Sequence, residues 1–191
     1  QPQQFMAQER NIIEEAYAGD IIGIFDPGLF QISDTLSTGS RTLAFEDIPV
    51  FPPEHFARVS PADSMKRKQF LRGVEQLAEE GAIQLYKEPD IGTETYIVGV
   101  VGVLQLDVLE YRLKAEYGVS IRQTPLNFRH ARWIQPIQGV WPDPKELNVT
   151  STTQVALDKD DMPVLLFESD WAIQWAIDRN KGLQLASIHE R

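Results

Sequence analysis

The sequence predicts an α+β fold, because strand and helix signals alternate in one particular order between residues 53 and 124. Two segments, 63–80 and 103–117, carry apolar residues at three- and four-residue spacings, the periodicity of an amphipathic helix. Four short segments around them are rich in β-branched and aromatic residues, which is typical of strands. The order is therefore strand, helix, strand, strand, helix, strand. It defines a ferredoxin-like split βαβ domain, in which two helices cover one face of a four-stranded antiparallel sheet.

The first strand and helix are predicted over residues 56–80. Phe56–Val59 forms the strand, and Ser60–Asp63 supplies turn and cap chemistry for the helix that follows. Gly81 is placed as a C-terminal stop. The apolar stripe that should face the sheet consists of Met65, Phe70, Leu71, Val74, Leu77 and Ala78.

The second half of the domain begins with a β-hairpin. Its strands are Ile83–Tyr86 and Thr95–Val101, joined by a turn at residues 89–93. Gly99 and Gly102 are not followed by a lysine, so they favour a tight strand-to-helix turn rather than a phosphate cradle. A second helix, closed by Gly118, and a strand at 119–122 complete the domain. The predicted buried residues of this helix are Val103, Leu106, Leu109, Leu113 and Tyr117.

Shorter elements flank this domain on both sides. Residues 1–52 carry strand signals near Phe5–Gln8, at Asp20–Phe25 and at Leu29–Ile32, with a turn at Asp26–Gly28. Prolines 49, 52 and 53 then place a boundary near Val50–Glu54. After residue 124 an α+β extension is predicted, with strands at 128–134, 149–157 and 164–167 and a helix at 169–180 whose Trp171, Trp175 and Ile177 share a side.

Composition narrows the classes of function. The 191 residues include no cysteine, so disulfides and cysteine-based metal sites are excluded, and a reducing cytoplasm fits. The net charge of −10 argues against general affinity for nucleic acid. Positive charge nevertheless collects in residues 53–132, where eleven bases balance eleven acids. Lys66, Arg67, Lys68 and Arg72 form the densest group, which either makes a basic binding face or simply solvates a helix.

No catalytic, metal or cofactor residue is predicted. The three histidines stand far apart, and the Gly-x-x-x-x-Gly-Lys-Ser/Thr phosphate loop is absent. The run Asp158–Asp161 is predicted to be a turn, with a calcium or magnesium site as the minor alternative. No apolar run approaches the length of about 18 residues that a membrane span requires.

Several segments carry a resemblance to a known family. The runs 56–59 and 66–84, followed by 96–109 and 112–117, resemble the third domain of the release factor 3 family of translational GTPases. Residues 19–23 and 32–36 are similar to the last strands of the β-barrel second domain of these GTPases. The resemblance covers nearly the whole chain and is sharpest from 53 to 134.

The resemblance implies a domain organisation. Residues 1–52 would be the remnant of β-barrel domain II, and residues 53–191 would be domain III, with a ferredoxin-like core at 53–124 and the α+β extension at 125–191. The chain starts at Gln1 without an initiator methionine, so it is expected to be a piece of a longer protein. GTP and magnesium would bind in the missing GTPase domain, and no enzymatic activity is expected here.

The resemblance also implies a function. The chain would be the ribosome-binding C-terminal region of a cytoplasmic factor that promotes recycling of class I release factors in translation termination. Its expected partners are ribosomal RNA, a small-subunit protein, the parent's GTPase domain and, indirectly, class I release factors, with no membrane. The alternatives are a domain of an elongation factor G-like GTPase and a ferredoxin-like ligand-sensing module. The candidate ribosome contacts are Lys66, Arg67, Lys68 and Arg72, then Arg129 and Arg132.

Overall fold

In a computed structural model the chain forms two compact units, Gln1–Asp47 and Ile48–Arg191. The structure describes residues 3–6, 9–12, 14–25, 30, 32–38, 43–46, 50–89 and 95–188. In the first unit, β1 (Gln3–Met6) pairs with β2 (Glu9–Ile12) and with β3 (Ile22–Gly23), both antiparallel. The strand predicted at 20–25 is thus shortened to two residues. The predicted turn at 26–28, part of the strand at 29–32 and most of the turn at 89–93 lie outside the described residues.

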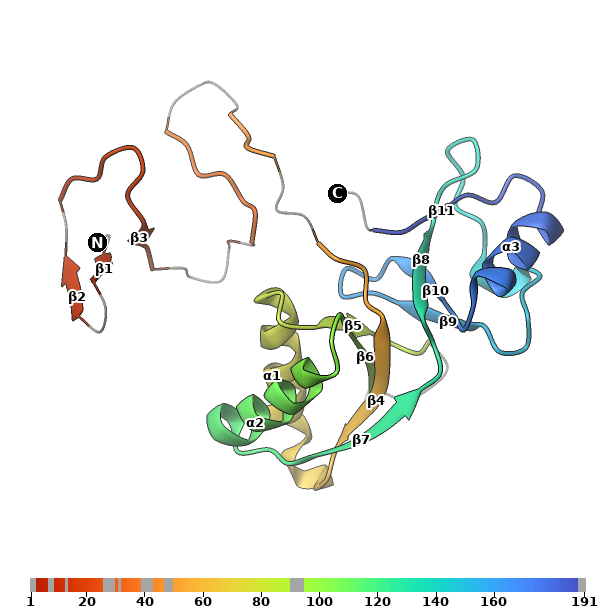
Figure 1. The fold of residues 1–191 in the computed structure, drawn as a ribbon, viewed down its shortest axis with the longest axis horizontal. Helices are drawn as coiled ribbons and strands as arrows, with labels where there is room; N and C mark the ends of the chain where they lie inside the picture. The colour runs from red at the N-terminus through yellow and green to blue at the C-terminus, as the bar shows by residue number, and fades with distance from the viewer. Residues whose placement is uncertain are drawn as a thin grey trace. The chain divides into compact units, whose positions relative to one another are not determined.

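The second unit contains the predicted ferredoxin-like domain. Its sheet has the strand order β5-β6-β4-β7, with every neighbouring pair antiparallel, and both helices lie on the same side of it (Figure 1). The strand order and the two helices confirm the α+β, split βαβ prediction. The elements are β4 (His55–Pro61), α1 (Arg67–Glu79), β5 (Gln84–Tyr86), β6 (Tyr96–Val100), α2 (Leu104–Tyr117) and β7 (Ile121–Leu126).

The helix-covered face of this sheet holds one core. Side chains alternate across a strand, so Val59 of β4 and Val98 of β6 face the helices, where they pack with Phe70, Leu77 and Leu113. Gly118 has φ of 66° and ends α2 in the left-handed conformation, as predicted.

The extension forms a second sheet with a third helix. Its strand order is β11-β8-β10-β9, all antiparallel, and α3 (Asp170–Arg179) packs against β10. Ser169 caps α3, because its Oγ accepts a hydrogen bond from the Ala172 amide at 3.3 Å. The strands are β8 (His130–Ile134), β9 (Gln154–Leu157), β10 (Pro163–Phe167) and β11 (Leu185–Ala186), of which only the last was not predicted.

The two sheets of this unit pack face to face. Phe56, Tyr86 and Ile97 of the first sheet share one core with Trp133 and Leu166 of the second. The layers therefore run α1 and α2, first sheet, second sheet, α3 (Figure 1). This packing accounts for strand β6, whose five residues are all buried, as expected for a strand covered on both faces.

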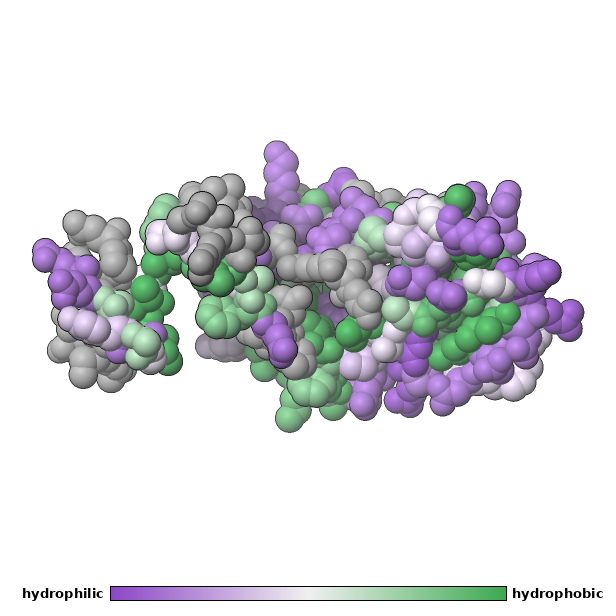
Figure 2. Space-filling view, turned by 90° about the horizontal axis from the view of Figure 1, so that it is seen from above, coloured by the Kyte–Doolittle hydropathy of each residue, from purple (hydrophilic) through white to green (hydrophobic). Residues whose placement is uncertain are grey.

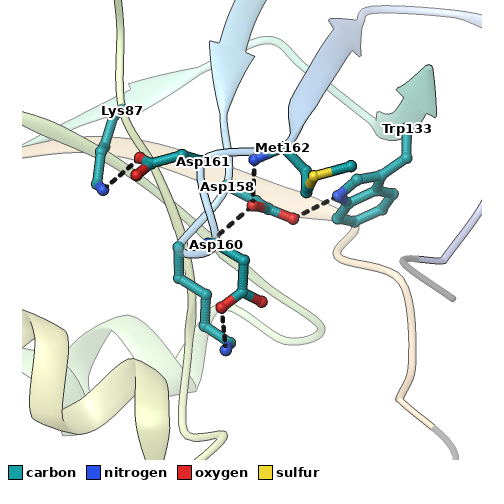
Figure 3. A network of polar contacts seen from close by, with 7 residues as sticks. Lys87, Trp133, Asp158, Asp160, Asp161 and Met162 are labelled. Carbon is teal, nitrogen blue, oxygen red and sulfur yellow. Dashed lines mark hydrogen bonds and ion pairs between the residues drawn. The ribbon is translucent and has the colours of Figure 1, made fainter. Parts of the chain in front are cut away.

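A polar network joins the sheets at one edge (Figure 3). The buried Asp158 carboxylate accepts hydrogen bonds from Trp133 Nε1 at 2.8 Å and from the amides of Asp160 and Met162, both at 2.9 Å. The Lys87 ammonium lies 2.7 Å from Asp161 Oδ1, and this hydrogen bond raises the pKa of Lys87. Asp158 thus orders the β9–β10 turn that was predicted at 158–161.

Several predicted details were wrong. Asp63 caps only a 3-10 turn, η1 (Ser64–Lys66), so α1 begins at Arg67. Met65 and Val103 are exposed instead of buried, because each lies before the first α-helical residue. In α3 the buried side is formed by Ala172 and Ala176, which let the helix approach the sheet closely, while Trp171 is exposed. Gly99 lies inside β6, where a Cβ atom would come within 2.9 Å of Pro53 and Tyr86.

Candidate functional site

The basic residues at the start of α1 take up different environments. Lys68 and Arg72 are exposed and lie one turn apart, on the side of α1 that faces away from the core. Glu75 and Glu79 continue the same exposed side toward the C-terminal end. The outer face of α1 is therefore basic in its first half and acidic in its second.

This charge order opposes the helix dipole. The N-terminal end of a helix is partially positive, so cations there are unfavourable by about 0.3–1 kcal/mol each. The first turn of α1 contains Arg67 and Lys68 and no acidic residue, and Lys66 at the N-cap position makes no side-chain capping bond. A local arrangement that costs stability is expected where function selects it.

Lys66 and Arg67 are only half-exposed. Arg67 lies near Tyr96. Burial raises the pKa of Tyr96 above its usual value and Glu75 adds to the rise, while the charges of Lys87 and Arg67 partly offset it. Arg67 therefore lies at the edge of the core, and Lys68 with Arg72 forms the exposed part of the cluster.

Arg122 joins the same end of the domain. It is exposed in β7, and its guanidinium donates a hydrogen bond of 3.2 Å to the Ala62 carbonyl, just before η1. The sequence could not place it there, because the contact depends on the pairing of β7 with β4. Lys68, Arg72 and Arg122 are the exposed cations that we define as the basic end of the first domain.

Arg132 lies in β8 of the second sheet, and Arg129 lies just before this strand. Arg129 is exposed, and Arg132 is half-buried with its guanidinium donating to the Ala131 carbonyl at 2.9 Å. Ala131 and Trp133 point into the core between the sheets, so Arg132 points to the opposite face, where α3 lies. The structure therefore does not bring these two arginines together with the basic residues of α1.

The outer face of α2 has a different character. Leu104, Val108 and Tyr111 are exposed there. Arg112 on the flank of this face lies 2.7 Å from Glu80 and 2.6 Å from Glu116, and these hydrogen bonds raise the pKa of Arg112 and lower that of Glu116.

The part of the chain that the structure describes shows neither a metal site nor a membrane-spanning helix. No group of three or more His, Asp or Glu side chains there could hold a metal ion. No helix among those residues is long and apolar enough to cross a membrane.

The geometry defines an α+β unit with a basic end, formed by α1 and β7, and an apolar outer face on α2. Comparison with known proteins gives its family. Residues 45–177 match the family model described as class II release factor RF3, C-terminal domain, and residues 1–39 match elongation factor G domain 2. The chain belongs to the class II release factor RF3 family, which confirms the predicted resemblance.

Individual relatives agree with the family assignment. The chain is 49% identical over 183 residues to peptide chain release factor 3 of Symbiobacterium thermophilum, covering 96% of the chain and 34% of the relative. It is 44% identical to the proteins of the same name from Listeria monocytogenes and Streptococcus thermophilus, covering 97% and 95% of the chain and 34% of each relative. The chain thus spans about a third of the length of these relatives.

Proposed function

We propose that this chain is the ribosome-binding C-terminal region of a release factor that promotes recycling of class I release factors in translation termination. The observation that carries the proposal is the basic end of the first domain. Lys68 stands exposed in the first turn of α1, where a cation is unfavourable, and Arg72 is exposed one turn later, in a chain of net charge −10. Clustered cations on an acidic protein direct phosphate binding to one place.

The proposal extends to the domain organisation and the partners. Residues 1–52 are the remnant of domain II and residues 53–191 are domain III. The parent's GTPase domain, with its GTP and magnesium, lies outside this sequence, and the chain itself has no enzymatic role. Ribosomal RNA and a small-subunit protein are the direct partners in the cytoplasm, and class I release factors are affected indirectly.

Among the predicted contacts, Lys68 and Arg72 are favoured over the others. Their exposed side chains can reach a phosphate without disturbing the core, whereas Lys66 and Arg67 are half-buried. Arg129 and Arg132 lie on a separate surface and would require a second contact. Arg122 is added to the set because it lies at the same end as the start of α1.

Sedimentation of the 191-residue chain with purified ribosomes tests this proposal. Binding should be present at low salt. The logarithm of the binding constant should fall linearly with the logarithm of the salt concentration, because phosphate contacts release counterions. A parallel GTP-binding measurement should be negative. Absence of ribosome binding at low salt, or GTP binding by the chain alone, would overturn the proposal.

A further inference from the structure

The outer face of α2 exposes an apolar stripe to solvent. Leu104, Val108 and Tyr111 stand at positions i, i+4 and i+7, so they form one continuous row on the helix. Their exposed fractions are 74%, 53% and 72%. Val103, just before the helix, is 56% exposed and adjoins the row. A row of this length is typical of a surface that another molecule covers.

A groove runs beside this stripe. Its apolar lining includes Leu77 and Ile83 from the α1–β5 side and Val108 and Leu109 from α2. The two polar lining residues are already engaged. Gln105 Oε1 accepts hydrogen bonds from the Val101 and Gly102 amides, at 2.8 and 3.1 Å, and Arg112 pairs with two carboxylates. The groove is therefore suited to an apolar side chain of a partner.

The rim of the stripe and groove is acidic. Four carboxylates and two cations surround the stripe and the groove, which gives the rim a net charge of −2. Arg112, one of the two cations, is paired with two of the four carboxylates. An acidic rim around an apolar surface attracts Lys and Arg and repels phosphate. The rim residues are Glu80, Asp107, Glu110, Arg112, Lys114 and Glu116.

We infer that the outer face of α2 and its groove bind a basic amphipathic protein segment, with apolar side chains on the stripe and Lys or Arg over the acidic rim. A second copy of this chain fits poorly, because it would bring two acidic rims together. Residues 1–52 fit poorly too, since they carry eight acids and two bases. The identity of the partner rests on the proposed function, under which the segment belongs to a small-subunit protein of the ribosome.

Hydrophobic residues also reach the surface elsewhere, for example over the end of the second unit that contains β8, β11 and α3 (Figure 2). Trp171 of α3 is 68% exposed. Nothing in the structure indicates the chemistry of a partner for that surface. The α2 surface is distinguished by its charged rim and its groove.

The first test uses a synthetic helical Leu/Lys peptide of about 18 residues, long enough to form a helix on binding. Fluorescence anisotropy should show that the 191-residue chain binds this peptide and not a Leu/Glu peptide of the same pattern. The triple variant Leu104→Ser, Val108→Ser, Tyr111→Ser should bind at least about tenfold more weakly. Met65→Ser is the matched control, because Met65 is 87% exposed and lies outside α2.

Equal peptide affinity of the triple variant and the unmodified chain would overturn the inference, as would no affinity at all. Circular dichroism checks that the triple variant keeps its helices.

The second test separates this surface from the proposed function. With purified ribosomes, the triple variant should sediment less than the unmodified chain, and the Leu/Lys peptide should compete with the chain. If both forms sediment equally, the ribosomal partner is overturned while the proposed function stands. If the unmodified chain fails to sediment yet binds the peptide through α2, the proposed function fails and the basic-segment surface stands.

Discussion

Helices α1 and α2 cover the same face of one sheet, yet their outward faces differ. The outer face of α1 is charged throughout, with Lys68 and Arg72 followed by two glutamates. The outer face of α2 is apolar along Leu104, Val108 and Tyr111, and charge is confined to its flanks. Both helices bury one stripe against the same core. The shared core therefore does not account for the difference between their outer faces.

The comparison also shows what periodicity can and cannot detect. In α1 polar residues alternate with a single apolar stripe, so the buried side is visible in the sequence. In α2 the predicted side packs against the core, but a second apolar stripe lies opposite it, and periodicity gives no sign that this second stripe stays exposed. Leu109 and Leu113 are buried, whereas Leu104 and Val108 are exposed.

The sharpest test of this difference substitutes leucines on opposite sides of α2. Leu113→Ala should destabilise the domain by about 2–5 kcal/mol, because Leu113 is fully buried and its truncation leaves a cavity. Leu104→Ala should change stability by no more than about 0.5 kcal/mol, since Leu104 is 74% exposed. Urea unfolding midpoints measure both. Equal losses would mean that α2 is oriented differently.

The contact between the two helices gives the next largest effect. A Cβ atom at Gly73 of α1 would lie 2.6 Å from Leu113 Cδ2 and 3.0 Å from Tyr117 Cγ. Gly73→Val should therefore destabilise the domain by about 1–3 kcal/mol through overpacking. Gln69→Val on the exposed side of α1 is the control, because it changes helix propensity without meeting α2. A Gly73 variant no less stable than the control would show that the helices do not pack this closely.

The ion pairs on the flank of α2 give the smallest effect. Hydrogen bonds from Arg112 lower the pKa of Glu116, so its contribution is present at neutral pH and is lost as the pH falls through that lowered pKa. Arg112→Gln should raise the pKa of Glu116 toward its usual value, with little change in stability at neutral pH. An NMR titration of the Glu116 carboxyl in the variant and in the unmodified chain measures the shift. An unchanged Glu116 pKa would mean that the pair does not persist in solution.

Much of the first domain could be predicted because each element carries its own local signal. The helix stripe of α1, the stop at Gly81 and the hairpin strands all depend on neighbouring residues. The stacking of the second sheet on the first was not predicted, because it depends on contacts between distant residues such as Tyr86 and Trp133. The uninterrupted apolar runs of β6 and β10, in which nearly every residue is buried, reflect this packing locally.

The candidate site was predictable in part for the same reason. Lys68 and Arg72 are close in sequence, and a helical period is enough to place them on one side of α1. Arg122 was missed as a neighbour because only the sheet register brings it to Ala62. The apolar outer stripe of α2 was missed because its leucine and valine residues resemble core residues.

The most direct test of ribosome binding through the basic end is the double variant Lys68→Glu, Arg72→Glu, measured by sedimentation with purified ribosomes across a salt series. Lys68→Glu alone should leave the domain as stable or slightly more stable, by about 0.3–1 kcal/mol, because an acid suits the first turn of a helix. Lys145→Glu with Lys181→Glu is the control for net charge, since both lysines are exposed and lie in the extension, outside the basic end and outside α2. We predict that the Lys68, Arg72 double variant binds ribosomes more weakly and with a shallower salt dependence, while the control binds normally. Unchanged binding of the double variant, with the same salt dependence as the unmodified chain, would contradict the account.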